Sequence, residues 1–328
     1  MKIIIPAAGA GTRLRPHTHL LPKAMLQVAG RPIIGHIIDT VTRDLEASEI
    51  IIIVGYKKEP LMAWVHRSYP DLPVRFVEQK EMLGLGHAVF TAAPYVNDDD
   101  ELFIILGDTI VDMDLPAMVS QGCSALGTRE VEDPRRFGVA EVREGVISRL
   151  VEKPDIPPSR LALMGVYYIR EAKILFDSIK VIMDRGIKTK NEYQITDALN
   201  HMISGGVTMR TFNVDNWFDC GTIETLLETN RFLLKKQKLP EKEAGTGSVL
   251  IPPVFIGEGA VVEDSVIGPD VSVGARVTIK DSIIRDSIIY DGADIRSVVA
   301  EKSLFGTNCK VRGVFSRMNT GPDTQLGE

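Results

Sequence analysis

Cysteine is scarce in this sequence. It occurs three times, as Cys123, Cys220 and Cys309, at positions far apart in the chain. This spacing suits neither a metal-binding cluster nor a framework of disulfides, and it fits a reducing compartment. We therefore expect a cytoplasmic protein without structural disulfides.

Long apolar runs and an excess of positive charge are also missing. The run at residues 3–5 is too short for a signal peptide or a membrane span, and no later segment reaches spanning length without charges. The net charge is −6, whereas nucleic acids and anionic membranes bind basic surfaces. We expect neither as a partner. Any phosphate site must come from locally placed Lys, Arg and backbone N–H groups.

The length of 328 residues predicts two domains. From residue 1 to 235, short β-branched runs alternate with longer amphipathic stretches. This order predicts parallel α/β units with ligands outside the carboxyl ends of the strands, in a Rossmann-like α/β domain with a mixed, mostly parallel sheet. Strands are expected at 3–5, 50–54, 74–77 and 102–106, and a helix at 33–45.

The second part of the chain has a different character. Residues 236–248 are polar, charged and rich in glycine at their end, which indicates a linker. From Val249 an aliphatic residue recurs about every five to six positions, which predicts a parallel β-helix over 249–328 with about four coils of about eighteen residues. A β-sandwich is the alternative, but hairpin signals are sparse. We expect the polar tail from Ser316 to be a cap or a loosely ordered end.

A loop with two glycines follows the first expected strand, and it reads Ala-Gly-Ala-Gly-Thr-Arg-Leu from residue 8. Glycine lets backbone N–H groups approach and surround one anion. A dinucleotide-binding loop would have a third glycine where this chain has Leu14, and a P-loop would end in Gly-Lys-Ser/Thr, which is absent. A simple βα turn is less suitable, because Arg13, Arg15 and Lys23 cluster in an acidic protein. Arginine offers a triphosphate bidentate, charge-assisted hydrogen bonds.

The segment from Ala8 to Leu14, with Pro22 and Lys23 at this distance, resembles the signature of the sugar-1-phosphate nucleotidyltransferases. The resemblance implies a nucleotidyltransferase domain followed by a small left-handed β-helix of hexapeptide repeats. It implies that Arg13 and Lys23 are catalytic and grip the triphosphate. The other nucleotide-binding residues that it implies in this loop are Ala8, Gly9, Gly11 and Thr12.

A second loop, from Gln79 to Ala88, follows another expected strand. The glutamine amide carries a donor and an acceptor that can pair with the edge of a pyrimidine, and Gly84 leaves room for a flat base. Taken alone, the segment is an ordinary polar loop before a helix. It resembles the base-recognition loop of uridylyl- and thymidylyltransferases, which implies UTP or dTTP. We expect His87 to be structural.

Two carboxylates from distant parts of the sequence are candidate metal ligands. Asp108 ends an apolar run, and Asp219 lies in Trp-Phe-Asp-Cys-Gly-Thr. One aspartate after a strand is most often a cap or turn former, but two are the least that a protein contributes to a Mg²⁺–triphosphate site. The family resemblance implies that Asp108 and Asp219 hold Mg²⁺.

The sugar-phosphate pocket rests on resemblance alone. It implies that Glu152 bonds to sugar hydroxyls, that Lys153 meets the sugar phosphate and that Gly138 lies against the sugar. Glu192 and Tyr167 are expected near the same pocket, and core packing is an equal alternative for Tyr167.

The implied reaction transfers a nucleotidyl group from dTTP or UTP to a sugar 1-phosphate, with glucose 1-phosphate as the expected acceptor, and releases pyrophosphate. A guanylyltransferase acting on mannose 1-phosphate and a non-catalytic regulatory subunit remain alternatives, while Leu14 disfavours an oxidoreductase. The last histidine is His201, so the β-helix lacks the usual base of an acyltransferase. We expect it to serve oligomerisation or regulation, in a homo-oligomer.

Overall fold

The computed structural model describes residues 1–237 and 245–313. The chain forms two compact units. The first consists of Met1–Gln27 and Arg31–Leu226, and the second of Val28–Gly30 and the chain from Leu227 onward. The division falls within helix α7 (Ile223–Lys236), not after it. Most of the expected linker, residues 238–244, and the tail from Ser316 lie outside the described residues.

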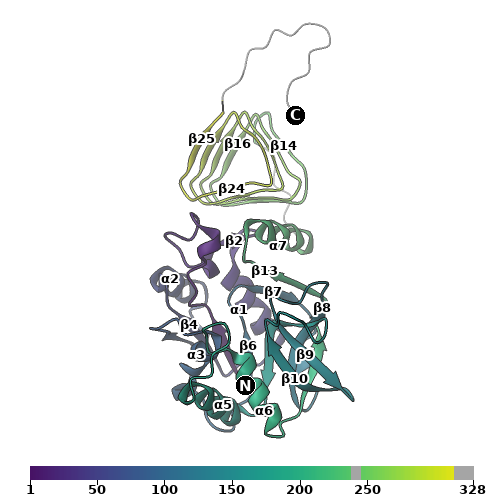
Figure 1. The fold of residues 1–328 in the computed structure, drawn as a ribbon. Coiled ribbons are helices and arrows are strands. Elements are labelled where there is room, and N and C mark those ends of the chain that lie inside the picture. The colour runs from purple at the N-terminus through teal and green to yellow at the C-terminus, as the bar shows by residue number, and fades with distance from the viewer. Residues whose placement is uncertain (238–244, 314–328) are drawn as a thin grey trace. The chain divides into compact units, whose positions relative to one another are not determined.

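A nine-stranded sheet forms the first unit (Figure 1). Its main path runs β10-β9-β11-β6-β1-β4-β5, while β8 pairs with β11 and β12. Strands β6, β1, β4 and β5 are parallel, and β11 is antiparallel to β6. The mixed α/β sheet is thus confirmed. Its strands are β1 (Lys2–Pro6), β4 (Glu49–Val54), β5 (Val74–Glu78), β6 (Leu102–Ile105), β8 (Ser124–Glu130), β9 (Gly138–Arg143), β10 (Val146–Glu152), β11 (Leu161–Ile169) and β12 (Met209–Asn213).

The central strands form where the sequence has unbroken β-branched runs, because strands covered on both faces need apolar residues at every position. Ile4 belongs to a core cluster with residues of α5 and α6, while Ile3 and Ile5 point to the opposite face and are also fully buried. Both faces of β1 are therefore covered, as expected for a sheet that lies between two layers of helices. The helices of this unit are α1 (Ile33–Asp44), α2 (Lys58–Ser68), α3 (Leu85–Phe90), α4 (Leu115–Val119), α5 (Ala172–Asp184), α6 (Ile195–Ser204) and the start of α7.

Shorter elements complete this part of the chain. Strand β13 (Asn216–Asp219) pairs with β7 (Thr109–Asp112) in an antiparallel ribbon. The remaining elements are β2 (Gln27–Val28), β3 (Arg31–Pro32) and the 3₁₀ helices η1 (Thr12–Leu14), η2 (Lys23–Met25) and η3 (Ala93–Tyr95).

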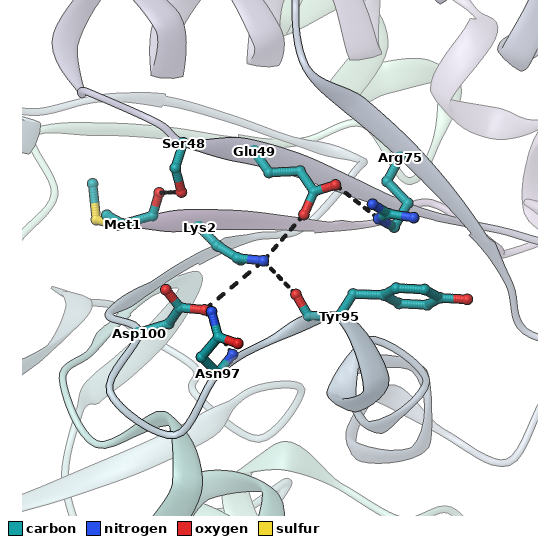
Figure 2. Close-up of polar contacts among 8 residues, drawn as sticks. All are labelled: Met1, Lys2, Ser48, Glu49, Arg75, Tyr95, Asn97 and Asp100. Atoms are coloured by element: carbon teal, nitrogen blue, oxygen red, sulfur yellow. Dashed lines mark hydrogen bonds and ion pairs between the residues drawn. The ribbon is translucent and has the colours of Figure 1, made fainter.

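A polar cluster joins the starts of β1, β4 and β5 to the segment before β6 (Figure 2). Lys2 Nζ lies 3.2 Å from Glu49 Oε2 and 3.8 Å from Asp100 Oδ2, and it also donates to the Tyr95 carbonyl. Arg75 Nε donates to Glu49 Oε1 at 2.7 Å, with its guanidinium 4.6 Å from the centre of the Tyr95 ring. The cluster closes the edge of the sheet where the strands begin.

Replacing Lys2 with methionine should lower the free energy of unfolding by about 1–2 kcal/mol, because the carboxylates and the carbonyl around it lose their shared cation. Its side chain is only 14% exposed. Urea unfolding measures the change. Lys58→Met is the matched control, since Lys58 pairs with Glu78 at a more exposed site and should cost less than about 0.5 kcal/mol. Equal losses in the two variants would contradict a special role for the Lys2 cluster.

The second unit contains the predicted left-handed parallel β-helix, with coils of triangular outline (Figure 1). Three sheets of four parallel strands form its sides, so that the expected four coils are present. The first sheet is β14 (Val249–Leu250), β17 (Val266–Ile267), β20 (Ile283–Arg285) and β23 (Val299–Glu301); the second is β15 (Val254–Ile256), β18 (Val271–Val273), β21 (Ile288–Ile289) and β24 (Leu304–Phe305); the third is β16 (Val261–Glu263), β19 (Thr278–Lys280), β22 (Asp294–Arg296) and β25 (Lys310–Arg312).

The coils are shorter than the eighteen residues expected. The register advances 17 residues from Val249 to Val266 and 16 from Ile283 to Val299. The step from 17 to 16 residues arises at a corner: residues 268–270 connect β17 to β18, whereas only residues 286–287 separate β20 from β21. In the described part of the chain no helix is both long and apolar enough to span a bilayer.

Candidate active site

Two adjoining cavities open beside the carboxyl ends of β1 and β6. The larger has a volume of about 540 Å³ and the smaller about 270 Å³. Four residues line both cavities, namely Leu85, Leu106, Asp108 and Glu192. Two ligands bound in these cavities would therefore meet at Asp108.

The glycine loop forms part of the wall of the larger cavity. Ala8 and Gly9 line it, and a Cβ added at Gly9 would meet no atom within 4 Å, so the backbone there is open to a ligand. Gly11 has a φ of 59° and starts η1, whose Leu14 is fully buried. Leu14 stands where a dinucleotide-binding loop has its third glycine, and its buried side chain holds this loop against the core. Gly11 and Thr12 lie in the turn itself.

Lys23 connects the loop region to β6. Its Nζ lies 2.6 Å from Asp108 Oδ2, and the lysine side chain is 13% exposed. The ends of β1 and β6 come close here because residue 107 is glycine: an added Cβ would lie 2.8 Å from the Pro6 carbonyl. The structure therefore brings together one predicted catalytic residue and one predicted metal ligand on the wall of the larger cavity.

Gln79 lines the same cavity and is 5% exposed. Its Nε2 lies 3.2 Å from the Gly84 carbonyl oxygen and 3.1 Å from His87 Nδ1. Because a carbonyl oxygen can only accept, the nitrogen end of the amide must face Gly84. His87 thus orients Gln79 by accepting its second N–H, which is the structural role expected for this histidine.

The base loop is tied to the segment that carries Glu192. Tyr193 N donates to the Leu83 carbonyl and Gly86 N donates to the Tyr193 carbonyl, both at 2.8 Å. Gly84 has a φ of 114°, and a Cβ there would lie 2.6 Å from the Tyr193 oxygen. Glycine is required at this position by both conformation and space. The pairing places Glu192 between the two cavities.

Asp219 reaches the smaller cavity from the neighbouring ribbon. It lies opposite Thr109 in the β7–β13 pairing, and Cys220 N donates to the Asp108 carbonyl at 3.0 Å. Asp108 and Asp219 both line the smaller cavity. Two carboxylates fit Mg²⁺, which prefers oxygen ligands and takes the rest from phosphates and water. Among the described residues no group of three or more His, Cys, Asp or Glu side chains could hold a metal alone.

The predicted sugar-phosphate residues surround the smaller cavity. Glu152, 8% exposed in its side chain, accepts a hydrogen bond from Thr196 Oγ1 at 2.7 Å and lies 3.4 Å from Lys153 Nζ. A Cβ added at Gly138 would come within 3.0 Å of Glu152 Oε2. Tyr167 lines the cavity and also belongs to the core, where burial, and then the charge of Glu152, raise its pKa. Tyr167 therefore lies both on the cavity wall and in the core, and its contact with a sugar stays a prediction.

Arg13 does not lie on the wall of either cavity described so far. It lines a third, of about 390 Å³, together with Asp219 and Lys153. This third cavity shares four residues with the smaller one, which are Arg136, Phe137, Lys153 and Asp219. Arg13 is therefore placed on the side of the sugar-phosphate residues and the metal candidate Asp219.

Several lining residues escape the motif analysis. The rings of Phe137 and Trp217 pack edge to face with centres 5.4 Å apart, and Trp217 Nε1 donates to the Met164 carbonyl. Arg136 lies over the Phe137 ring at 5.7 Å. Gln194, 4% exposed, donates to Glu192 Oε2 at 3.0 Å. Trp217 lies two residues before the predicted metal ligand Asp219, and Gln194 lies two residues after Glu192. This closeness in the sequence to predicted site residues was the only signal that could have identified them.

The sequence matches the model of the nucleotidyl transferase family over residues 2–236. A glucose-1-phosphate thymidylyltransferase of Streptomyces antibioticus is 31% identical over 330 residues, covering 95% of this chain and 85% of that protein. The UTP–glucose-1-phosphate uridylyltransferase AglF of Haloferax volcanii is 32% identical over 225 residues, covering 66% of this chain and 89% of its own.

A solved structure is also similar to this chain in fold. A UDP-glucose pyrophosphorylase solved in complex with UDP-glucose superposes with a TM-score of 0.61 and 28% identity, over 72% of this chain and 99% of its own. The family match covers the first unit from residue 2 onward, including the glycine loop, both aspartates and the base loop. The chain therefore belongs to the nucleotidyl transferase family, as a sugar-1-phosphate nucleotidyltransferase.

Proposed function

We propose that the protein transfers the nucleotidyl group of UTP or dTTP to a sugar 1-phosphate, with glucose 1-phosphate as the acceptor, and releases pyrophosphate. One observation carries the proposal: a cavity walled by the glycine loop and Gln79 meets a cavity walled by Glu152, and Asp108 lines both. The relatives named for uridylyl and thymidylyl transfer to glucose 1-phosphate support the same pair of substrates.

The preference for a uracil or thymine base rests on Gln79. Both N–H groups of its amide are engaged, by the Gly84 carbonyl and by His87 Nδ1. The oxygen Oε1 is left as the group that can accept a hydrogen bond from a ligand. Uracil and thymine carry a donor at N3, whereas cytosine carries an acceptor there. We therefore propose that Gln79 selects UTP or dTTP over CTP.

Replacing Gln79 with leucine should raise the KM for UTP or dTTP about 10-fold or more, because the N3–H loses its acceptor in a buried site. The preference over CTP should fall with it. Initial rates of pyrophosphate release with UTP, dTTP, CTP, GTP and ATP measure both effects. Gln194→Leu is the matched control: this glutamine is equally buried but lines the sugar cavity, so the change should act on the KM of the sugar phosphate. GTP as the preferred substrate of the unaltered enzyme would favour the guanylyltransferase alternative.

The chemistry needs positioning and charge neutralisation more than a covalent intermediate. A phosphate oxygen of the sugar phosphate, already an anion, attacks the α-phosphorus in line with the leaving pyrophosphate and needs no general base. Lys23 holds the α-phosphate, which requires its ion pair with Asp108 to loosen. Lys153 positions the nucleophile. Arg13 stabilises the charge that develops on pyrophosphate, which requires its side chain to turn away from the third cavity that it lines here. A bound Mg²⁺ on Asp108 and Asp219 would neutralise phosphate charge.

The side wall of the sugar cavity supplies the recognition of the acceptor. Glu152 offers buried carboxylate oxygens to sugar hydroxyls, and the edge-to-face pair of Phe137 and Trp217 offers an apolar wall. A regulatory subunit that only binds ligands is the competing function. Asp108 and Asp219 lining one cavity favour the enzyme, because binding alone does not require both carboxylates.

A further inference from the structure

The smaller cavity, where the acceptor is proposed to bind, has an excess of negative charge on its wall. Its charged lining residues are the acids Asp108, Glu152, Glu192 and Asp219 and the bases Arg136 and Lys153. The phosphate of a sugar 1-phosphate adds a further charge of about −1.5 to −2 at neutral pH. A bound Mg²⁺ would balance the two aspartates. The two glutamates and the incoming phosphate therefore depend on the two bases.

Lys153 cannot balance this charge alone. Its Nζ lies 3.4 Å from Glu152 Oε1, so that part of its positive charge is already shared with a buried carboxylate. The backbone of Lys153 has a φ of 42°, an unfavourable conformation for a residue with a side chain. Such conformations persist where the surrounding structure holds a side chain in a functional position. The phosphate of the acceptor needs a second cation besides this lysine.

Arg136 is held on the same wall by the backbone and by aromatic rings. Phe137 N donates to the Pro134 carbonyl, and Lys153 N donates to the Phe137 carbonyl, both at 2.9 Å. Arg136 therefore directly precedes the residue that pairs with Lys153. Its guanidinium carbon lies 5.7 Å from the centre of the Phe137 ring, which packs against Trp217. The arginine lines both the smaller cavity and the third one.

The neighbouring arginine is already engaged, whereas Arg136 is not. Arg135 donates two hydrogen bonds to the Asp133 carboxylate, at 2.8 Å and 2.7 Å, and these bonds lower the pKa of Asp133 to about 2. Arg136 forms no ion pair with any carboxylate in the described ranges, 1–237 and 245–313. A guanidinium that lies over an aromatic ring keeps its N–H groups available at its edge. Arg136 can therefore donate to an anion in the cavity.

We propose that Arg136 is a second phosphate-binding residue for the acceptor, and that it holds the phosphate of the sugar 1-phosphate together with Lys153. The guanidinium fork matches two phosphate oxygens, which leaves the third oxygen for the attack on the nucleotide. Arg136 then determines the affinity for the acceptor and not for the nucleotide. This inference rests on the proposed function, because it concerns the acceptor of that reaction.

Initial rates of pyrophosphate release, with nucleotide and glucose 1-phosphate varied independently, give the first test. Arg136→Met should raise the KM of glucose 1-phosphate about 30-fold and leave the KM of the nucleotide within about twofold. Arg136→Lys should recover most of this loss, because it keeps the charge and loses only the fork. Arg135→Met is the matched control: it removes the same charge one residue away and should leave both KM values within about twofold. Thermal melts verify that the variants fold.

Isothermal titration calorimetry with Mg²⁺ and α,β-methylene-UTP, an analogue that cannot be cleaved at the transferred bond, tests the binding without turnover. Glucose 1-phosphate should bind Arg136→Met about 30-fold more weakly than the unaltered protein. Methyl α-glucoside, which lacks the phosphate, should bind both proteins equally. Because this comparison needs no reaction, it stays conclusive even if no pair of substrates releases pyrophosphate, a result that would refute the proposed function separately.

Three results would overturn the role of Arg136. The first is equal affinity of Arg136→Met and the unaltered protein for glucose 1-phosphate, or no binding to either. The second is a rise in the KM of the nucleotide in place of the KM of the acceptor, which would assign Arg136 to the triphosphate. The third is an equal loss of affinity for methyl α-glucoside, which would show that Arg136 only supports the Phe137 ring.

Discussion

Replacing Asp108 with asparagine should lower kcat on the order of 10³-fold while leaving the fold intact. Asp108 lines both the nucleotide cavity and the sugar cavity and accepts the Lys23 ammonium at 2.6 Å. The substitution keeps the shape and the hydrogen bond to lysine but removes the negative charge. It therefore removes the group proposed to hold Mg²⁺ with Asp219, at the place where the transferred phosphorus must lie.

The matched control for this variant is Asp112→Asn. Asp112 ends the strand β7 that follows Asp108, and its Oδ2 accepts a hydrogen bond from Asn216 at 3.2 Å. It lines neither cavity among the described residues, so its neutralisation should leave kcat within about twofold. Pyrophosphate release and thermal melts compare the two variants. Activity of Asp108→Asn near that of the unaltered protein would exclude the role that we propose for this carboxylate.

Replacing Glu152 with glutamine should raise the KM for the sugar phosphate about 10²-fold and leave the KM for the nucleotide unchanged. The carboxylate is almost fully buried, and Thr196 and Lys153 hold it toward the sugar cavity. Hydrogen bonds from sugar hydroxyls to a buried charge contribute about 3 kcal/mol together, which corresponds to about 10²-fold in affinity. Glutamine also leaves the charge of Lys153 unbalanced, and this lysine is proposed to position the nucleophile, so kcat should fall as well.

The control for Glu152 lies on the neighbouring strand. Glu141 pairs across β9 and β10 with Arg149, at 3.5 Å on the surface. Glu141→Gln should leave both KM values unchanged. Full initial-rate matrices, with nucleotide and sugar phosphate varied independently, separate the two constants. Equal rises in both KM values for Glu152→Gln would indicate a general distortion of the sheet, and they would contradict a specific sugar site.

The sequence predicted the elements that depend on local pattern. Unbroken isoleucine runs placed β1 and β4, because strands covered on both faces leave no polar positions. The aliphatic period placed the β-helix with its four coils. The coil length was overestimated. The first coils advance by 17 residues, and the short corner between β20 and β21 reduces the advance to 16.

The geometry of the site depends on registers between distant segments, which local pattern does not report. The pairing of Tyr193 with Leu83 joins the base loop to the segment that carries Glu192, and only the fold reveals it. The same holds for the edge-to-face packing of Phe137 on Trp217 and for Arg13 on the wall of the third cavity. Sequence motifs identified the residues that carry the chemistry, and the fold shows which of them line the same cavity.

Pyrophosphate release in mixtures of one nucleotide and one sugar 1-phosphate tests the central claim most directly. The purified protein with Mg²⁺ should release pyrophosphate from UTP or dTTP only when glucose 1-phosphate is present. Mass spectrometry should detect the matching nucleoside-diphosphate sugar in equal amount. Absence of pyrophosphate with every pair of nucleotide and sugar phosphate would contradict the account, and it would favour a subunit that binds these ligands without transferring the nucleotide.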